Sequence, residues 1–540
     1  MFLNKTKTAT VIDRLIVACI FSFILLFVIK CISVSLTTRF TFDGAMNVQV
    51  AQNLVNHHKY ATSYDGLHLF DPRVQTGITV TLPVAIFFKI FGESFESGLS
   101  INAIYLILLL FSLIYYLKYC LRSNNYFVLL AVLVFLGTPK LFSLGFGLLG
   151  EIPALFYFLI SIIFLHKFYG TSKAVFVFYS GIFVALSYLT KTVMLISIPA
   201  ILFVMVLDNI GSIRSQRRIN LTPIALFIVG FFTPLFIFEL YKFHSLGPAA
   251  YSLWWSDQAN AILKQAGLSE GFADTTGIIA KALKHLGLLA SYININEIII
   301  VIFIIILITF SCAIIFHIYG KRKMAWRVDF ENIFGPTKEL LILLLVTLSY
   351  LGWWILITPT EKTWYRRVIN GVILYEFCVV IFIYFIYAAY QKRVQFTNKR
   401  SIKYYEIGKT AISMIILAVC FLNINNTGNL NITFDNEEDK TWVLETGNFI
   451  DKLPEESEFF GVGWWQAPNI AFVSGKNFND INHSQETHIP GYLDDKYLVV
   501  DVDAHELDPG AYEAVLLGYD YQLVFSNEEN FVYKLIYRKQ

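Results

Sequence analysis

The sequence predicts a polytopic α-helical membrane protein with about eleven spans and a small α/β domain at its C-terminal end. The 540 residues are 56% hydrophobic and 15% charged, with a mean hydropathy of +0.58, which is more apolar and less charged than soluble domains usually are. Residues 424–540 hold 21 Asp and Glu against 7 Lys and Arg, a net charge of −14, so that with +2 overall the rest carries +16. An acidic tail on a basic membrane body argues against nucleic acid as a partner.

Apolar runs of about 18 or more residues recur along the chain, and each is long enough to cross a bilayer. The apolar segment 78–91 is shorter, so we expect it to dip into the membrane without crossing it. We read the first run as a retained span, because no small-residue cleavage site follows it. The expected spans are 11–34, 97–118, 124–138, 150–166, 172–188, 190–207, 221–242, 296–319, 337–358, 367–390 and 406–423.

Basic residues cluster in alternate loops, which sets the orientation because Lys and Arg concentrate on the cytoplasmic side. Lys5, Lys7 and Arg14 place the N-terminus inside, and an odd number of spans then places the tail outside. We expect the bacterial inner (plasma) membrane as the location.

The expected domains are a transmembrane part, 1–423, and a soluble extracytoplasmic α/β domain, 424–540. The transmembrane part carries a first outer loop at 35–96 and a long outer loop at 243–295, where helical spacing of apolar residues predicts surface-lying helices. In the tail, EFFGVGWW and KYLVVDVD read as strands, Asp508 and Pro509 as the start of a helix, and the last residues as a hairpin.

The polar segment 40–92 carries the most informative pattern. Asp43 begins a stretch with Met46, Val50 and Leu54 on one face, which predicts a juxtamembrane helix with a carboxylate at its N-terminus. Considered without the rest of the segment, Asp43 is expected to be the N-cap of this helix and not a catalytic residue. The segment continues with His58-Lys59-Tyr60, Phe70-Asp71-Pro72-Arg73, Gly77, Pro83 and Phe91-Gly92.

This segment resembles the first extracytoplasmic loop of the GT-C glycosyltransferases of the protein O-mannosyltransferase and aminoarabinose-transferase type. Those enzymes open the loop with an acidic motif, often Asp-Glu, whereas here the pair is Asp43-Gly44 and the second acid is missing. The resemblance covers roughly residues 10–390 and is absent from the tail. It implies an inverting transfer of a sugar from a polyprenyl-phosphate carrier, with Asp43 as the general base that deprotonates the acceptor.

Glu151, in Gly150-Glu151-Ile152-Pro153, begins the fourth span on the outer side. GT-C relatives commonly place an acidic residue in this second outer loop, which implies that Glu151 binds substrate or assists Asp43. The alternative is a favourable helix start, since Glu near a helix N-terminus with Pro in the first turn is stabilising.

The short outer loop 359–367 carries arginines, although Lys and Arg otherwise concentrate in the loops expected on the cytoplasmic side. Trp364-Tyr365-Arg366-Arg367 occupies the place where relatives carry an Arg-Tyr or Arg-His pair, and Arg binds phosphate oxygens bidentately. For the arginines, the alternative is an interfacial anchor that holds this helix end. For Lys191, which lies between two closely joined spans, the alternative is a side chain that snorkels to lipid headgroups. The residues expected to bind the donor phosphate are Arg366, Arg367, Lys191 and Arg73.

Aromatic faces stack on sugars, although interfacial aromatic residues are ordinary in membrane proteins. His57 and His58 are adjacent and have no third ligand nearby, so no metal site is predicted, and no cofactor is certain. A divalent metal stays open but has no ligand cluster to support it. The candidate sugar contacts are Tyr60, Tyr365, Trp254, Trp255, Trp464 and Trp465.

Two rival functions remain at this stage. A transporter or flippase of lipid-linked sugars explains the many spans, but transporters place polar groups near the bilayer midplane, whereas these candidates lie in outer loops. A non-catalytic GT-C relative stays open because the second acid is missing. The expected partners are a polyprenyl-phosphate sugar donor, an acceptor lipid, glycan or protein, and membrane lipids.

Overall fold

The computed structural model divides into two compact units, which we call the helical unit and the loop–tail unit. The helical unit comprises Met1–Lys30, Tyr105–Phe142 and Glu151–Asn431. The loop–tail unit comprises Cys31–Ile104, Ser143–Gly150 and Ile432–Gln540. The structure describes residues 2–64, 66–72, 74, 76–216, 220–265, 277–293, 297–319, 337–360, 363–395, 424, 429, 440–462, 466–481, 489, 491–502 and 519–538.

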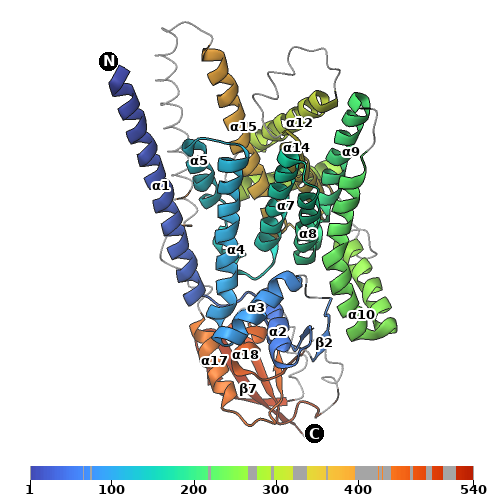
Figure 1. Cartoon of the computed structure of the whole chain (residues 1–540). Coiled ribbons are helices and arrows are strands. Elements are labelled where there is room, and N and C mark those ends of the chain that lie inside the picture. Colours follow the sequence, from blue (N-terminus) through green and yellow to red (C-terminus); the bar gives the residue numbers. More distant parts are fainter. Residues whose placement is uncertain are drawn as a thin grey trace. The chain divides into compact units, whose positions relative to one another are not determined.

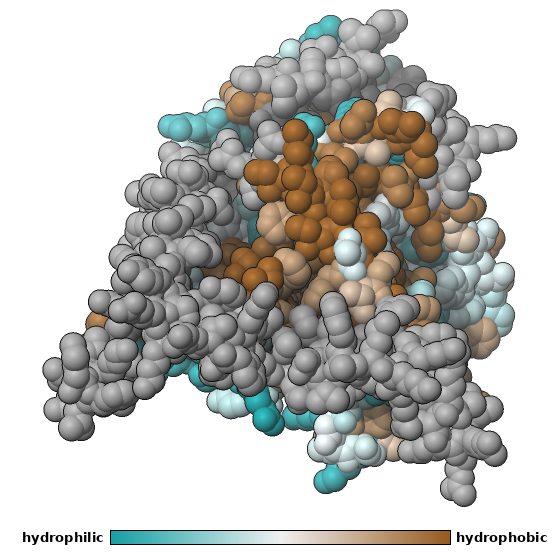
Figure 2. All heavy atoms as spheres, turned by 90° about the horizontal axis from the view of Figure 1, so that it is seen from above, coloured by the Kyte–Doolittle hydropathy of each residue, from teal (hydrophilic) through white to brown (hydrophobic). Residues whose placement is uncertain are grey.

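Eight of the described helices are long and apolar enough to cross a membrane, and the chain is an integral membrane protein. These candidate spans are Asp13–Thr37, Phe95–Cys120, Glu151–Thr171, Thr192–Ile210, Thr222–Leu263, Glu297–Ile315, Lys338–Ile357 and Ile369–Ala388. Large side chains on several of them are exposed, which suits lipid as the solvent. Figure 2 shows hydrophobic side chains gathered in the middle of the face that it presents.

The predicted span positions agree with the helices, with differences in length. The segments expected at 124–138 and 172–188 form helices of 12 and 16 residues, α5 (Asn125–Leu136) and α8 (Val175–Thr190), which are shorter than a straight crossing requires. The predicted short segment is the 14-residue helix α3 (Ile78–Phe91). The last predicted span, 406–423, lies outside the described residues.

The helices of the helical unit follow one another along the chain, some with short irregular turns between them (Figure 1). Figure 1 also shows the N-terminus and the C-terminal ends of α9 and α15 at the same end of this unit. Their bounds are α1 (Phe2–Thr37), α4 (Phe95–Tyr115), α5 (Asn125–Leu136), α6 (Leu141–Phe146), α7 (Glu151–Thr171), α8 (Val175–Thr190), α9 (Ser197–Gln216), α10 (Thr222–Gln265), α11 (Ile278–Ile293), α12 (Glu297–Tyr319), α14 (Thr337–Gly352) and α15 (Ile369–Gln395). Parts of α1, α4 and α6 belong to the loop–tail unit.

Glycine lets α8 and α10 pack with their backbones in close approach. A Cβ atom at Gly181 would lie 2.3 Å from the carbonyl oxygen of Phe227, and one at Gly230 would lie 2.2 Å from that of Phe178. Small residues at such crossings are how membrane helices associate where water supplies no hydrophobic force. The α8–α10 pair is therefore a fixed element of the helical unit.

In the long outer loop predicted at 243–295, the described residues are almost all helical. Helix α10 runs on past Pro248, with a break at Gly247, whose φ of 73° is the left-handed conformation that glycine adopts readily. Helix α11 follows, with Ile278, Ile279 and Leu283 exposed on one side. The predicted amphipathic pattern is present.

The loop–tail unit holds a mixed five-stranded sheet in the order β4-β3-β5-β7-β6. The pairs β4–β3 and β3–β5 are parallel, and β5–β7 and β6–β7 are antiparallel. The elements are α2 (Phe42–Asn56), β1 (Ala61–Thr62), β2 (His68–Leu69), α3, α17 (Thr441–Asp451), β3 (Phe459–Gly461), α18 (Ala467–Ser474), β4 (Phe478–Asp480), β5 (Tyr497–Asp501), β6 (Tyr519–Ser526) and β7 (Asn530–Tyr537).

The small α/β tail is confirmed, with additions. Both predicted strands and the terminal hairpin are present as β3, β5 and the β6–β7 pair. Helices α17 and α18 and strand β4 were not predicted. The helix predicted from Asp508 lies outside the described residues. The sheet core consists of Phe460, Val462, Ile481, Leu493, Leu498, Val500, Tyr519 and Leu535.

Candidate functional site

Glu151 and Lys191 form a buried ion pair in the helical unit. Glu151 is in the first turn of α7, and its Oε1 lies 3.0 Å from the Nζ of Lys191. Lys191 ends α8 in an extended conformation (φ −150°, ψ 117°), immediately before the 3-10 turn η2 (Thr192–Ile196). Only 6% of the Glu151 side chain and 17% of the Lys191 side chain is exposed. Ionisable side chains buried in a membrane protein are costly and usually functional.

Polar side chains from two further helices join this pair. Tyr350, near the end of α14, interacts electrostatically with both Glu151 and Arg367. Asn370, in the first turn of α15, donates a weak hydrogen bond to the sulfur of Met194 in η2, at 3.9 Å. Both side chains are at most 1% exposed. The fold therefore brings together the beginnings or ends of four helices.

Two buried polar atoms of this cluster, Glu151 Oε2 and Arg367 Nη1, have no hydrogen-bond partner among the described residues. The Tyr350 hydroxyl, by contrast, interacts with the side chain of Asn370. An unsatisfied buried atom costs free energy, on the order of 1–3 kcal/mol and more for a charged group, unless a bound molecule or water satisfies it. The two atoms make this cluster the candidate binding site.

The two arginines of the cluster, Arg366 and Arg367, are neighbours in one short helix. The short helix η4 (Tyr365–Arg367) carries both, and their guanidinium groups lie 4.8 Å (Arg366) and 5.7 Å (Arg367) from the centre of the Trp364 ring. Burial, and then the like charge of Arg366, lowers the pKa of Arg367 to about 10, so the guanidinium keeps its charge at neutral pH. A buried cation that lacks a full set of acceptors favours an anionic ligand.

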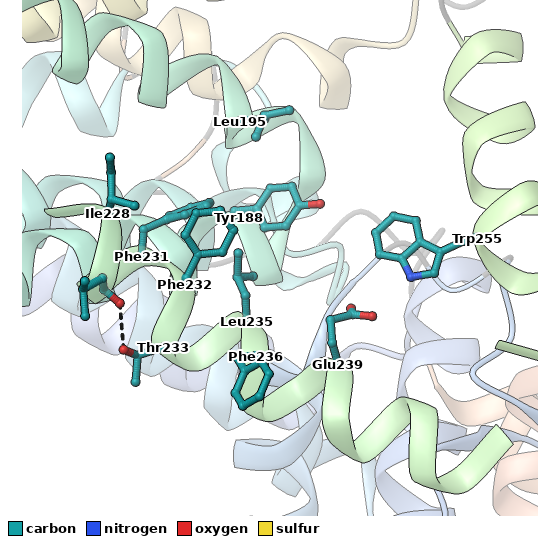
Figure 3. A pocket seen from close by; sticks show the side chains of 11 residues that line it. Tyr188, Leu195, Ile228, Phe231, Phe232, Thr233, Leu235, Phe236, Glu239 and Trp255 are labelled. Atoms are coloured by element: carbon teal, nitrogen blue, oxygen red, sulfur yellow. Dashed lines mark hydrogen bonds between the residues drawn. The ribbon is translucent and has the colours of Figure 1, made fainter. Parts of the chain in front are cut away.

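An apolar cavity of about 770 Å³ is lined by α8, α10 and η2 (Figure 3). Leu195 of η2 lines it, one residue after Met194, which contacts the polar cluster. Glu239 and Trp255 lie toward one side of it in Figure 3. The other lining residues are Tyr188, Ile228, Val229, Phe231, Phe232, Thr233, Leu235 and Phe236.

Two lining residues, Glu239 and Trp255, lie beside a local network that spans the break at Gly247 in α10. Glu239 accepts hydrogen bonds from Lys242 Nζ (2.7 Å) and from the Tyr251 hydroxyl (2.9 Å). Lys242 also lies 3.5 Å above the ring of Trp254. One face of Trp254 is thus in contact with a lysine, and its predicted sugar contact, like that of Trp255, stays a prediction.

Asp43 lies in the loop–tail unit, in the first turn of α2. The cap of this helix is Thr41, whose side-chain oxygen accepts a hydrogen bond from the backbone N–H of Gly44 at 3.2 Å. Thr41 thus supplies the side-chain cap, so capping does not account for Asp43. Its carboxylate is still favoured by the positive end of the helix dipole.

The first turn of α2 binds the segment 143–150 of the same unit. Thr41 Oγ1 donates to the carbonyl oxygen of Gly147 (2.9 Å), and Asn47 Nδ2 donates to that of Leu148 (2.6 Å). A Cβ atom at Gly44 would lie 2.6 Å from the Gly147 oxygen. This close approach leaves no room for a larger side chain directly after Asp43.

The other residues of the first outer loop have structural contacts. The ring of Tyr60 stacks on Phe70 at 5.0 Å, and its hydroxyl donates to the carbonyl oxygen of Thr76 at 3.3 Å. Asp71 accepts a hydrogen bond from Thr62 at 2.7 Å. The predicted sugar contact of Tyr60 remains a prediction, and Arg73, Trp464 and Trp465 lie outside the described residues.

The tail packs on the residues that precede α2. Asn469 Nδ2 of α18 donates to the carbonyl oxygen of Phe40 (2.9 Å), and the Phe472 ring lies 5.3 Å from that of Phe40. Arg39 pairs with Glu529 of the terminal hairpin at 2.5 Å. The tail therefore helps to fix the start of the Asp43 helix.

Of the residues in this cluster, the sequence predicted Glu151, Lys191, Arg366 and Arg367 as site residues but not Tyr350 and Asn370. The available signal was a polar side chain within or next to an apolar span, since such residues tend to be functional. No group of three or more His, Cys, Asp or Glu side chains in the described part of the chain is arranged to hold a metal ion.

No protein-family model matches the sequence, and no curated protein matches it. Solved structures do match. The crystal structure of ArnT from Cupriavidus metallidurans bound to undecaprenyl phosphate aligns with 96% of this chain and 98% of its own, at a TM-score of 0.61 and 10% identity. The oligosaccharyltransferase of Archaeoglobus fulgidus, in complex with Zn and sulfate, aligns with 95% of this chain and 73% of its own, at a TM-score of 0.51 and 12% identity. At these identities the likeness shows the fold.

Proposed function

Because the chain has the GT-C fold, we propose that it is a glycosyltransferase that moves a sugar from a polyprenyl-phosphate carrier to an acceptor lipid, glycan or protein. The ArnT structure of that fold holds undecaprenyl phosphate, a carrier of this chemical class. We further propose that the transfer takes place at the outer face of the membrane, with the N-terminus in the cytoplasm. In Figure 1 the N-terminus and the C-terminal ends of α9 and α15 lie at the same end of the helical unit, and Arg214 and Lys392 are close to two of these ends in the sequence. Because Lys and Arg concentrate on the cytoplasmic side, this arrangement supports the proposed orientation.

The polar cluster of the helical unit carries the proposal. Arg367 holds a buried guanidinium nitrogen without a partner among the described residues, next to Tyr350 and a second arginine. A phosphate supplies acceptor oxygens with negative charge, which is what these donors lack. Arg366, Arg367 and Lys191 bind the donor phosphate in this proposal, and Arg73 is a further candidate.

The apolar cavity suits the carrier's hydrocarbon chain. Its wall is made almost wholly of aromatic and aliphatic side chains, and several of them, such as Phe232 and Phe236, are more than half exposed. Polyprenyl chains are apolar and gain free energy in such surroundings. The cavity shares η2 with the polar cluster, which supports the proposal that one carrier molecule places its chain in the cavity and its phosphate at the cluster.

In the proposed reaction an acceptor hydroxyl or amine attacks the anomeric carbon of the sugar. The bond from that carbon to the phosphate oxygen breaks, and the polyprenyl phosphate leaves as an anion. Asp43 takes the proton of the acceptor as general base, and Glu151 binds substrate or assists. The cations on the phosphate lower the barrier by stabilising the charge that develops on the leaving group. Attack from the face opposite the phosphate inverts the anomeric centre.

The test is transfer from a panel of radiolabelled polyprenyl-phosphate sugars to a membrane extract by the purified chain in proteoliposomes. We expect a labelled product from at least one donor with wild type, and at least tenfold less with Arg367→Ala. The matched control is Arg538→Ala, which removes an exposed arginine of the tail.

The outcomes separate the rival functions. Movement of labelled donor across the membrane without transfer supports a flippase and contradicts the proposal. Neither transfer nor movement, with every donor, supports a non-catalytic relative. Equal transfer by wild type and Arg367→Ala keeps the enzyme and removes the assigned phosphate site.

A further inference from the structure

Helix α11 exposes apolar side chains and buries two of its three basic ones, Lys281 and His285, whereas Lys284 is exposed. Ile278, Ile279 and Leu283 are 63%, 75% and 61% exposed, whereas Lys281 and His285 are buried. A helix on the surface of a water-soluble protein does the opposite. Its 16 residues extend about 24 Å, too short for a bilayer core of about 30 Å. The helix therefore suits the membrane interface, with lipid on its exposed apolar side.

The polar side chains of α11 bind backbone carbonyls that precede the two arginines. Lys281 Nζ donates to the carbonyl oxygen of Ile357 at 3.1 Å, and Lys284 Nζ donates to that of Thr360 at 3.3 Å. The Tyr292 hydroxyl donates to the carbonyl oxygen of Thr363 at 3.1 Å. One helix thus contacts three points along the chain that leads from α14 to η4.

The Ile357 carbonyl is available because a helix ends there. Helix α14 passes into the π-helical turn η3 (Trp353–Ile357), and the last carbonyls of a helix lack partners within it. A lysine at this end satisfies a carbonyl and also interacts favourably with the negative end of the helix dipole. Lys281 is therefore placed where its charge stabilises the loop.

Two ring contacts complete the interface. His285 lies edge-on to Trp354 with 4.8 Å between ring centres, and both side chains are fully buried. Tyr292 lies 4.8 Å from Tyr365, the first residue of η4. The next two residues are Arg366 and Arg367, so α11 contacts the short helix that carries them.

We propose that α11 is a lipid-seated strap that positions Arg366 and Arg367 for the donor phosphate, with Lys281, Lys284 and Tyr292 as its positioning residues. This inference rests on the proposed function, in which those arginines bind the carrier phosphate. The strap acts through the loop backbone. When its hydrogen bonds are lost, the guanidinium groups of Arg366 and Arg367 no longer point toward the donor phosphate.

The experiment measures binding of undecaprenyl phosphate to the full-length chain in lipid nanodiscs. Tyr292→Phe removes one hydroxyl and keeps the ring against Tyr365, and Lys281→Met removes the ammonium group but keeps an unbranched side chain. We expect each to weaken binding about five- to tenfold. Lys281→Arg restores a cationic donor and is expected to recover most of the affinity.

Controls and a double variant separate positioning from general damage. Tyr179→Phe and Lys173→Met alter side chains in exposed positions away from α11 and should bind as wild type does. If α11 acts through the arginines, Lys281→Met added to Arg367→Ala will weaken binding less than it does alone, because coupled residues are non-additive.

Each result decides one claim. Binding by wild type with unchanged affinity in Tyr292→Phe and Lys281→Met overturns the strap but leaves the proposed function. Fully additive effects of Lys281→Met and Arg367→Ala also overturn it. No binding by wild type overturns the proposed function and the inference that rests on it. If Lys281→Met fails to fold, Tyr292→Phe decides alone.

Discussion

The buried hydroxyl of Tyr350 interacts with the charges of Glu151 and Arg367 and with the side chain of Asn370. A buried hydroxyl whose hydrogen bonds are incomplete weakens the fold unless a ligand uses it, so stability and binding should respond in opposite directions to its removal. We predict that Tyr350→Phe keeps or raises the melting temperature while weakening undecaprenyl-phosphate binding several-fold. Differential scanning fluorimetry and nanodisc binding measure the two effects. A loss of both together would show that Tyr350 serves the fold alone.

The close packing around Gly44 predicts the effect of placing a side chain directly after Asp43. A Cβ atom there would lie 2.6 Å from the Gly147 oxygen, so Gly44→Ala should destabilise the first turn of α2 by about 1–3 kcal/mol. Restoring the relatives' pair with Gly44→Glu should be worse, not better, for activity. Gly170→Ala is the matched control, because a Cβ atom there meets nothing within 4 Å. A Gly44→Glu variant with higher activity than wild type would contradict this account.

At the residue scale, charged candidates for the site could be recognised from the sequence, whereas neutral ones could not. Asp43, Glu151, Lys191 and the two arginines stand out because charge is rare beside apolar spans. Tyr350 and Asn370 do not stand out, since they lie inside or next to predicted spans. They reach the site only because the ends of α14 and α15 meet the start of α7, which is a property of tertiary packing and not of local pattern.

Among the elements, the α8–α10 pair forms most of the apolar cavity wall and depends on two glycines. A Cβ atom at Gly230 would lie 2.2 Å from a backbone carbonyl, which cannot move aside as a side chain could. We predict that Gly230→Ala forces α10 away from α8, lowers the melting temperature and weakens binding of undecaprenyl phosphate.

The comparison variants for the glycine pair are Gly181→Ala and Gly170→Ala. Gly181 lies in the same crossing and should give the same loss, whereas Gly170 lies in α7, away from it, and should give none. Unchanged melting temperature and binding in both crossing variants would show that the two helices are not packed as described.

Element positions followed from hydropathy, because a bilayer demands long apolar runs. The break at Gly247 in α10 was not predicted, although Gly followed by Pro is a usual signal for it. The tail helices α17 and α18 were also missed. They are 11 and 8 residues long, and helices this short are stabilised mainly by packing rather than by their own sequence.

At the scale of the whole molecule, the sequence places a domain boundary between residues 423 and 424. The compact unit around the tail also includes residues 31–104 and 143–150. Aromatic residues far apart in the sequence make this core: the Phe472 ring lies 5.3–5.9 Å from those of Phe40, Phe88 and Phe95. No local pattern reports such long-range contacts, so sequence reasoning had no signal for them.

Phe472 therefore tests whether the tail supports the Asp43 helix. We predict that Phe472→Ala costs about 3–5 kcal/mol of stability in this unit and makes the first outer loop sensitive to protease. Cleavage sites mapped by mass spectrometry should fall between residues 57 and 77. Phe525→Ala is the comparison, because its ring stacks on Phe449 within the tail. Equal loop cleavage in both variants would contradict the specific role of Phe472.

The most direct test of the central claim is sugar transfer by Asp43→Asn. Wild type and the variant are compared in matched amounts, with radiolabelled polyprenyl-phosphate sugars as donors and a membrane extract as acceptor, and Asp451→Asn as control. We predict product from wild type and the control, and at least a hundredfold less from Asp43→Asn, since a general base typically contributes that much. Equal product from Asp43→Asn and wild type would contradict the assignment of Asp43 as the base, and no product from any of them would contradict the transferase itself.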